Sequence, residues 1–264
     1  LNIAMQDHGG FNHNDQTLRV LTHIEKRHPD FNGLNLTWES LEGIVKHNGI
    51  VISNIPFHTN FYNNKYDLLL SKQPFLESQI AAIADDVAYN NHDVEDAIRA
   101  GLLSIDQLQE NTFFNNIINQ LKKEYTIIDD KLLMFQVLRK SMSLMIEDIY
   151  NQTNKNILDL EIKTKIDLQN CNDFIVTFSP SMQSKVQDIK SFLFENVYNH
   201  QNLLDKRQNV EKIMSNLFKY FYKSPNKLPD DWRSIKEPIE RVICDYISGM
   251  TDRYASRLHK DLYE

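Results

Sequence analysis

The chain has 264 residues, seven Gly, seven Pro and a formal net charge of −7. This length gives one large domain, residues 1–264, as the default, and the acidic balance argues against a general nucleic-acid binder. There is no apolar run of about 18 residues and only Cys171 and Cys244 as cysteines, so we expect no membrane span, no disulfide framework and a cytoplasmic protein.

The apolar residues recur mostly at helical spacing, which predicts an all-α protein. Residues 50–72 and 225–238 are interpreted as connections, and residues 155–180 lose the helical period. Within them, residues 173–178 form an apolar run that is too short to assign to helix or strand. The helices are predicted at residues 14–26, 35–47, 74–100, 104–108, 111–123, 130–154, 181–198, 210–222 and 239–262.

The most informative segment is residues 83–96, IADDVAYNNHDVED, which places five acids beside a His and a Tyr. Its apolar residues recur at three-, four- and seven-residue spacings, so it is predicted to be an amphipathic helix. Asp85, Tyr89 and Asp93 are four residues apart and share one stripe of that helix. A carboxylate can hold a hard cation, while a phenol and a second carboxylate can bind sugar hydroxyls. On spacing alone, a solvated acidic face is the alternative.

The segment ADDVAYNNHDVED resembles the last metal-ligand motif of the HD-domain deoxynucleoside triphosphate triphosphohydrolases, closest to their bacterial dGTPase-like branch. Other segments are similar to the same family in the same order, and together they extend over nearly the whole chain. They are GGFNHNDQTLRVLT (9–22), GLNLTWESLEGIVKHNG (33–49), KSFLFENVYNH (190–200) and DYISGMTDRYA (245–255). The family's first metal His, its HD dipeptide and the segment that follows them are absent from this chain.

The resemblance implies an HD-domain-like bundle of helices, incomplete at the N-terminus, with its nucleotide pocket roughly at residues 9–100 and 181–200. The family hydrolyses a dNTP to a deoxynucleoside and tripolyphosphate with the help of Mg²⁺ or Mn²⁺. Three of its four metal ligands are absent here, so we expect the isolated chain to bind metal weakly or not at all and to be inactive. The alternative is a non-catalytic remnant, or a subunit for nucleotide binding or assembly.

The resemblance also assigns roles to residues of the acidic helix. Asp85 is implied to be the metal ligand, and Asp86, about 100° further around the helix, is expected to be a supporting acid beside it. Tyr89 and Asp93 are implied to contact the deoxyribose, Asp93 through the 3′-hydroxyl. An ordinary polar helix face is the alternative for both residues.

Three further residues receive roles in the same way. His13 is similar in position to a family His that assists catalysis near the α-phosphate, a role that suits a group titrating near neutral pH. Lys190 is implied to hold a phosphate and Tyr198 to pack on the sugar; a solvated Lys and a core Tyr are the alternatives. The implied partners are a dNTP substrate and further copies of the chain, with no membrane and no strong nucleic-acid signal.

Overall fold

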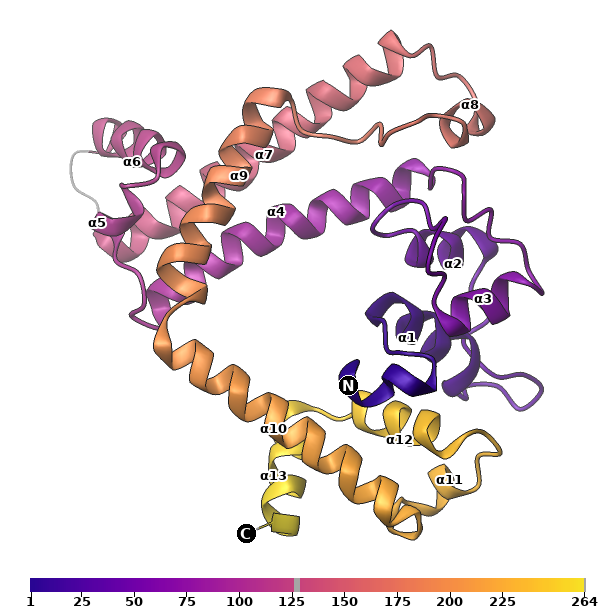
Figure 1. Ribbon diagram of the computed structural model, residues 1–264. Helices are drawn as coiled ribbons and strands as arrows, with labels where there is room; N and C mark the ends of the chain where they lie inside the picture. Colours follow the sequence, from indigo (N-terminus) through magenta and orange to yellow (C-terminus); the bar gives the residue numbers. More distant parts are fainter. Residues whose placement is uncertain (126–128, 264) are drawn as a thin grey trace. The chain divides into compact units, whose positions relative to one another are not determined.

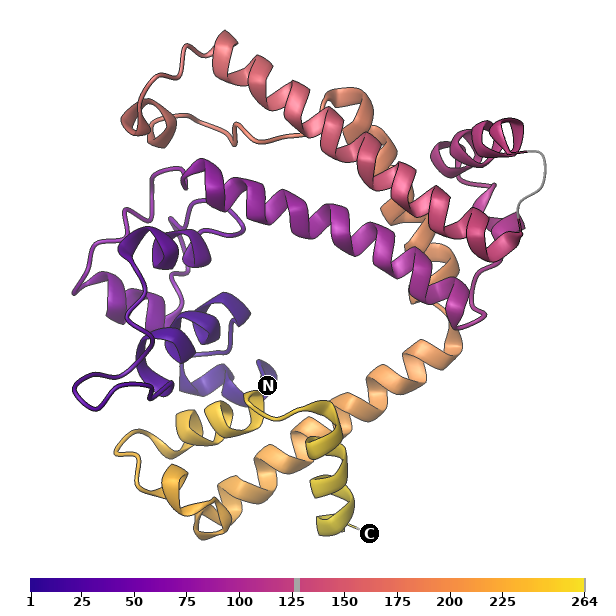
Figure 2. The same ribbon diagram turned by 180° about the vertical axis from the view of Figure 1, so that it is seen from behind.

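The computed structural model describes residues 1–125 and 129–263, and the regular structure in these ranges is helical (Figures 1 and 2). This confirms the all-α fold class. None of the helices in the described ranges is both long enough and apolar enough to cross a membrane. The chain divides into two compact units: unit 1 contains residues 1–45, 51–70 and 205–264, and unit 2 contains residues 46–50 and 71–204. The single domain stays a prediction.

Unit 1 is built from short helices at both ends of the chain. One apolar cluster includes the fully buried Met5, Leu217 and Ile243, and a second is centred on Leu18 and Leu68. The helices of this unit are η1 (Ile3–His8), α1 (His13–Arg19), η2 (Val20–Ile24), α2 (Trp38–Val45), α3 (Phe57–Asn63), α10 (Gln201–Lys223) from residue 205 on, η4 (Pro225–Lys227), α11 (Asp230–Arg233), α12 (Ile239–Ser248) and α13 (Asp252–Tyr263).

Two features of unit 1 differ from the sequence prediction. α3 lies in a stretch interpreted as a connection, because its first turn is held by a distant side chain: Asp15 accepts hydrogen bonds from the backbone N–H groups of His58 and Thr59. The helix predicted at residues 239–262 is interrupted between α12 and α13. The Thr251 hydroxyl accepts from the backbone N–H of Tyr254, which starts α13 as a separate helix.

Unit 2 is organised around three helices, α4 (Leu76–Arg99), α7 (Asp130–Asp159) and α9 (Pro180–Leu193), and α4 packs against both α7 and α9 (Figures 1 and 2). Their facing sides bury Val94, Met145 and Ile189 completely. The remaining elements are α5 (Ile105–Leu108), α6 (Thr112–Glu124), α8 (Lys165–Gln169), η3 (Phe194–Tyr198) and the first turn of α10.

The stretch without helical period, residues 155–180, contains the end of α7 and the short α8. α8 begins with a capping box in which the side chains of Thr164 and Asp167 each accept a backbone N–H from the other's residue. Residues 173–178 are neither helix nor strand. Instead, the backbone N–H groups of Ile175 and Val176 donate to the buried side chain of Gln79 on α4.

Candidate functional site

α4 presents the predicted acidic stripe on its exposed side. Val87 and Val94 are buried against the rest of unit 2, whereas the side chain of Asp85 is 76% exposed and Tyr89 is 58% exposed. This follows from the helical period, which puts the valines on one side and the stripe on another. The stripe is therefore accessible to a ligand from solvent.

Asp86 lies opposite Lys190 of α9. The Lys190 ammonium is 3.2 Å from Oδ1 and 3.1 Å from Oδ2 of the Asp86 carboxylate. Both side chains are about half exposed, so the ion pair is screened by solvent and contributes little to stability. This ion pair nevertheless keeps the Lys190 ammonium beside α4. Lys190 is the residue that the sequence resemblance assigned to phosphate binding.

Tyr198 of η3 reaches the next part of the stripe. Its hydroxyl donates to Oδ2 of Asp93, and Tyr89 is a further hydrogen-bonding neighbour of the same hydroxyl. Burial raises the pKa of Tyr198 above its ordinary value, and the hydrogen bonds to Asp93 and Tyr89 raise it further. The phenol is therefore protonated, and so a hydrogen-bond donor, throughout the physiological pH range.

The wide turn of η3 explains why Lys190 and Tyr198 both face α4. In a regular α-helix, residues eight apart are about 80° out of line, because two turns take 7.2 residues. η3 is a π-helical turn, which takes up an extra residue per turn and brings position 198 back toward the direction of position 190. π turns of this kind are frequent at functional sites.

His47 is a neighbour of Asp85 that the sequence analysis did not single out. Its Nε2 lies 3.7 Å from Oδ2 of Asp85. The turn that carries it is fixed on both sides: the Lys46 ammonium donates to the carbonyl of Lys72, and Gly49 adopts a φ of +107°. In the sequence, His47 is the last residue of the predicted helix at residues 35–47, and this position does not specify what the imidazole contacts.

A divalent cation would find part of a ligand set at this place. Asp85 offers a carboxylate oxygen and His47 an imidazole nitrogen, and both donor types suit Mn²⁺. Within residues 1–125 and 129–263, no group of three or more His, Cys, Asp or Glu side chains is arranged to hold a metal ion. The described residues thus fit one side of a cation and do not form a complete metal centre.

His13 belongs to unit 1, apart from the residues of unit 2 described above. It is the first residue of α1, directly after Asn12, whose side chain accepts the backbone N–H of Asp15. His13 is exposed, so its imidazole is accessible to a ligand from solvent. Its catalytic role stays a prediction.

A buried network of charged and polar side chains connects α1 to α12 and to Glu237 just before it. The guanidinium of Arg19 donates to Asp245 of α12 through Nε at 3.0 Å and Nη2 at 2.7 Å, and also to Glu237 at 2.5 Å. Gln16 donates to the same Asp245 carboxylate at 2.8 Å. Burial acts to lower the pKa of Arg19, but the two acids outweigh it and raise that pKa. Asp245, the first residue of the DYISGMTDRYA segment, therefore joins the two ends of the chain.

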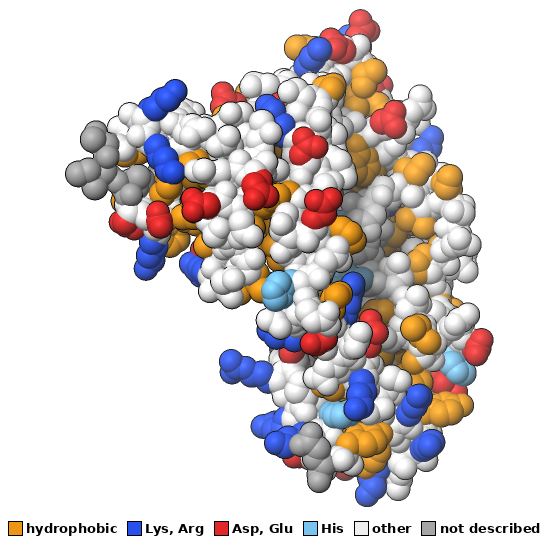
Figure 3. All heavy atoms as spheres, turned by 60° about the vertical axis from the view of Figure 1, so that its left-hand side comes forward, with side chains coloured by type: hydrophobic (Ala, Val, Ile, Leu, Met, Phe, Trp, Pro, Cys, Tyr) orange, Lys and Arg blue, Asp and Glu red, His pale blue; other side chains and the backbone are white. Residues whose placement is uncertain are grey.

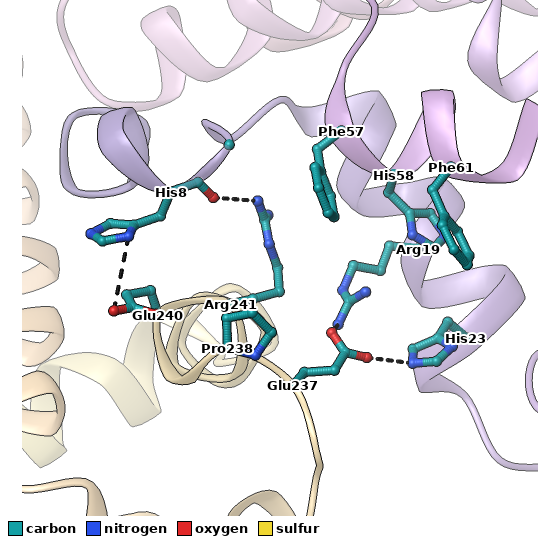
Figure 4. Close-up of a pocket in the computed structure, with 11 residues that line it drawn as sticks. His8, Arg19, His23, Phe57, His58, Phe61, Glu237, Pro238, Glu240 and Arg241 are labelled. Carbon is teal, nitrogen blue, oxygen red and sulfur yellow. Dashed lines mark hydrogen bonds and ion pairs between the residues drawn. The ribbon is translucent and has the colours of Figure 1, made fainter.

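A cavity of about 570 Å³ lies beside this network within unit 1, and Figure 4 shows the residues that line it. Phe57 and Phe61 form its apolar wall, and Arg241 donates to the backbone carbonyls of His8 and Gly10. Glu237 bridges Arg19 and His23, whose Nε2 is 2.7 Å from the carboxylate. The polar groups of the cavity thus serve mainly to connect α1, η1 and α12.

Charged side chains are interspersed on the face of the molecule shown in Figure 3, where Asp and Glu lie among neutral groups with Lys and Arg between them. Local density of acids therefore does not single out a site there. What distinguishes α4 is the identity of its neighbours: an ammonium, a phenol and an imidazole each face a different carboxylate.

Comparison with known proteins adds the family. Residues 176–261 match the model of the phosphohydrolase-associated domain, which includes the end of unit 2 and most of α10 to α13. The whole chain aligns with deoxyguanosinetriphosphate triphosphohydrolase-like proteins of Bartonella henselae (39% identity), Bartonella quintana (38%) and Brucella ovis (36%), and covers 69% of the length of each. The chain therefore belongs to the family of deoxyguanosinetriphosphate triphosphohydrolase-like proteins.

Proposed function

We propose that this protein acts in the metal-assisted hydrolysis of a dNTP, of the dGTP type, to a deoxynucleoside and tripolyphosphate. The observation that carries the proposal is the pairing in unit 2 between three carboxylates of α4 and the side chains of His47, Lys190 and Tyr198. A carboxylate with an imidazole, a carboxylate with an ammonium and a carboxylate with a phenol succeed one another along the helix. This order suits the cation, phosphate and sugar of one nucleotide.

The phosphate end would be bound by Lys190. Its ammonium is already oriented over α4 by Asp86, and a triphosphate would compete with that carboxylate for the same N–H donors. Since the ion pair is half exposed, exchanging Asp86 for a phosphate costs little. Lys serves here as a point charge that can follow the phosphate without a fixed geometry.

The sugar end would be bound by Asp93 and Tyr198. In the absence of nucleotide the phenol donates to the carboxylate, so both groups are already hydrogen-bonded and oriented. A 3′-hydroxyl could donate to Asp93 and accept from Tyr198, which leaves no polar group unsatisfied. Tyr89, one turn before Asp93 on α4, adds a ring and a second hydroxyl on the same side.

Asp85 would provide one ligand of a divalent cation, and His47 is placed to be a second ligand or to orient Asp85. When bound, such a cation polarises phosphate oxygens and lowers the pKa of a water molecule. The chain's own contribution is to set a carboxylate at the phosphate end of the stripe. We propose that the cation is Mg²⁺ or Mn²⁺, because the family uses these ions and because Asp85 and His47 offer an oxygen and an imidazole donor.

The second candidate is a nucleotide-binding or assembly subunit without hydrolysis. It is favoured by the fact that the phosphate and sugar contacts, Lys190, Asp93 and Tyr198, are protein groups that need no metal. In both candidates we place the protein in the cytoplasm, where its nucleotide ligands occur.

The two candidates are separated by measuring binding and turnover together. Binding of dGTP is followed by calorimetry, and release of deoxynucleoside and tripolyphosphate is followed by chromatography with Mn²⁺ or Mg²⁺ present. Both are run on this chain and on the chain joined at its amino end to the HD-motif segment of a family member. Turnover that depends on Asp85 supports hydrolysis, and binding without turnover supports the second candidate. Binding that is indifferent to Asp93 and Lys190 would contradict both.

A further inference from the structure

The outer side of α7 carries a stripe of exposed side chains that the nucleotide site does not use. Its members recur at three- or four-residue spacing and therefore lie along one side of the helix. Phe135 is 44% exposed, Ile146 is 59% exposed and Tyr150 is 68% exposed, although all three are large and apolar or aromatic. We call this the α7 stripe; it consists of Leu132, Phe135, Arg139, Ser143, Ile146 and Tyr150.

The α7 stripe is part of a shallow hollow of about 790 Å³ on unit 2. Phe135, Met142, Ile146 and Tyr150 of α7 line it, and Glu95 of α4 lies at its border. Exposed apolar surface of this kind, when it is continuous, marks a place of protein association. α7 has 30 residues, which corresponds to about 45 Å of helix available for a partner.

We propose that the α7 stripe is the contact between two copies of this chain, whose α7 helices pair antiparallel about a two-fold axis near Ser143. The stripe is symmetric about that residue: Phe135 lies eight residues before it and Tyr150 seven after it. In the antiparallel pair, Phe135 of each copy therefore meets Tyr150 of the other. Ser143 at the axis is small, so the helices can approach closely there.

The charges of α7 select the same arrangement. Arg139 lies four residues before Ser143 and Glu147 four residues after it, so each Arg139 lies level with the Glu147 of the second copy, within reach of its long side chain. Lys140, next to Arg139 on the same edge of α7 as Glu147, adds to the attraction. A parallel pair would instead set Arg139 against Arg139. Within the described residues of unit 2, the ion pairs at Asp85, Asp86 and Glu95 involve neither Arg139 nor Glu147, and both of these side chains are exposed.

This inference goes beyond the proposed function, because it names a surface and an orientation that neither hydrolysis nor nucleotide binding requires. It also assigns the contact between copies of the chain to one helix, α7. The occupant is a second copy and not an unrelated helix, because the stripe is complementary to itself in both size and charge.

The first test is sedimentation equilibrium of the full chain over a concentration series. We expect a reversible dimer in the wild type. Arg139→Glu should weaken it about tenfold or more, since two symmetric attractions become repulsive. The double variant Arg139→Glu, Glu147→Arg should restore most of the lost affinity. The matched control is Lys155→Glu, the same kind of charge reversal on the same helix but roughly 160° away from Arg139.

The second test fixes the position of the axis. Ser143→Cys, in a Cys171→Ser background that removes the more exposed native thiol, should give a cross-linked dimer with a short bismaleimide. Lys155→Cys in the same background should not. All variants are first checked for the wild-type helix content and melting temperature. A chain that is monomeric at every concentration, a dimer indifferent to Arg139→Glu, or equal cross-linking at positions 143 and 155 would each overturn the proposal.

Discussion

The hydroxyl of Tyr198 donates a hydrogen bond to the carboxylate of Asp93, and this bond joins η3 to α4. Both groups come from segments that the sequence associated with the sugar of a nucleotide. Each is therefore held in place by the other before a nucleotide arrives. Preorganisation of this kind lowers the entropy cost of binding.

Asp93→Ala should weaken dGTP binding by about ten- to a hundredfold, because a hydrogen bond to a charged group is worth about 1.5–3 kcal/mol. In a protein that turns over, the change should appear mainly in KM, since the sugar contact is made in both the ground state and the transition state. Calorimetry and steady-state kinetics measure the two effects. Asp159→Ala is the control, because Asp159 is an exposed acid at the end of α7 and does not belong to α4.

Asp86→Asn should leave dGTP binding intact or strengthen it by up to about fivefold. The substitution removes the carboxylate that competes with phosphate for Lys190, and an exposed ion pair of this type is worth at most about 1 kcal/mol. Lys190→Met should weaken binding and reduce its dependence on salt concentration. A large loss of affinity in Asp86→Asn would mean that Asp86 itself supports the cation or the nucleotide.

The acidic stripe could be predicted from the sequence because it depends on local helical spacing. Asp85, Tyr89 and Asp93 lie on one continuous helix, and the period alone places them together. The side chains that contact the carboxylates of α4 could not be predicted from local spacing. The facing positions of Lys190 and Tyr198 depend on a π turn that the sequence pattern does not reveal, and His47 meets Asp85 only through the fold of unit 2.

The same limit applies to unit 1. α3 was interpreted as a connection because the cap for its first turn comes from Asp15, 43 residues before His58. The network of Arg19 and Asp245 joins residues 226 apart in the sequence, so no local window contains both. By contrast, Leu41 and Val45 of α2 are buried as their local four-residue spacing on a helix indicates.

Asp245→Ala should lower the free energy of unfolding by about 3–5 kcal/mol, because it leaves the buried Arg19 guanidinium without its main acceptor. Urea unfolding followed by circular dichroism gives the difference. Asp261→Ala, an exposed acid on α13, should change the free energy of unfolding by only a few tenths of a kcal/mol. If the two variants unfold at the same urea concentration, the network does not hold unit 1 together.

His58 should make stability depend on pH. Burial and the nearby Arg19 charge lower its pKa from 6.5 to about 4, so the folded protein keeps this imidazole neutral. The unfolded chain binds the proton first as the pH falls, so this contribution is complete above pH 6.5 and is lost between pH 6.5 and about 4. The loss amounts to about 3 kcal/mol over that window, since one pKa unit is about 1.4 kcal/mol.

The measurement compares urea unfolding of the wild type and of His58→Asn at several pH values from 7 down to about 4. The variant should be less stable at pH 7 but should lose less stability on acidification, because it has no imidazole to protonate. Parallel curves for the two proteins would show that another group controls the acid transition.

The central claim is that Asp85 supplies a metal ligand for dNTP hydrolysis. Its most direct test is Mn²⁺-dependent release of tripolyphosphate from dGTP by the chain joined to the family's HD-motif segment, with Asp85→Asn compared against Asp159→Asn, an exposed acid on α7. Asn keeps the size of the side chain but removes the negative charge that a hard cation requires. We predict that Asp85→Asn abolishes release while Asp159→Asn keeps the wild-type rate; near wild-type release by Asp85→Asn would contradict the metal assignment and the function built on it.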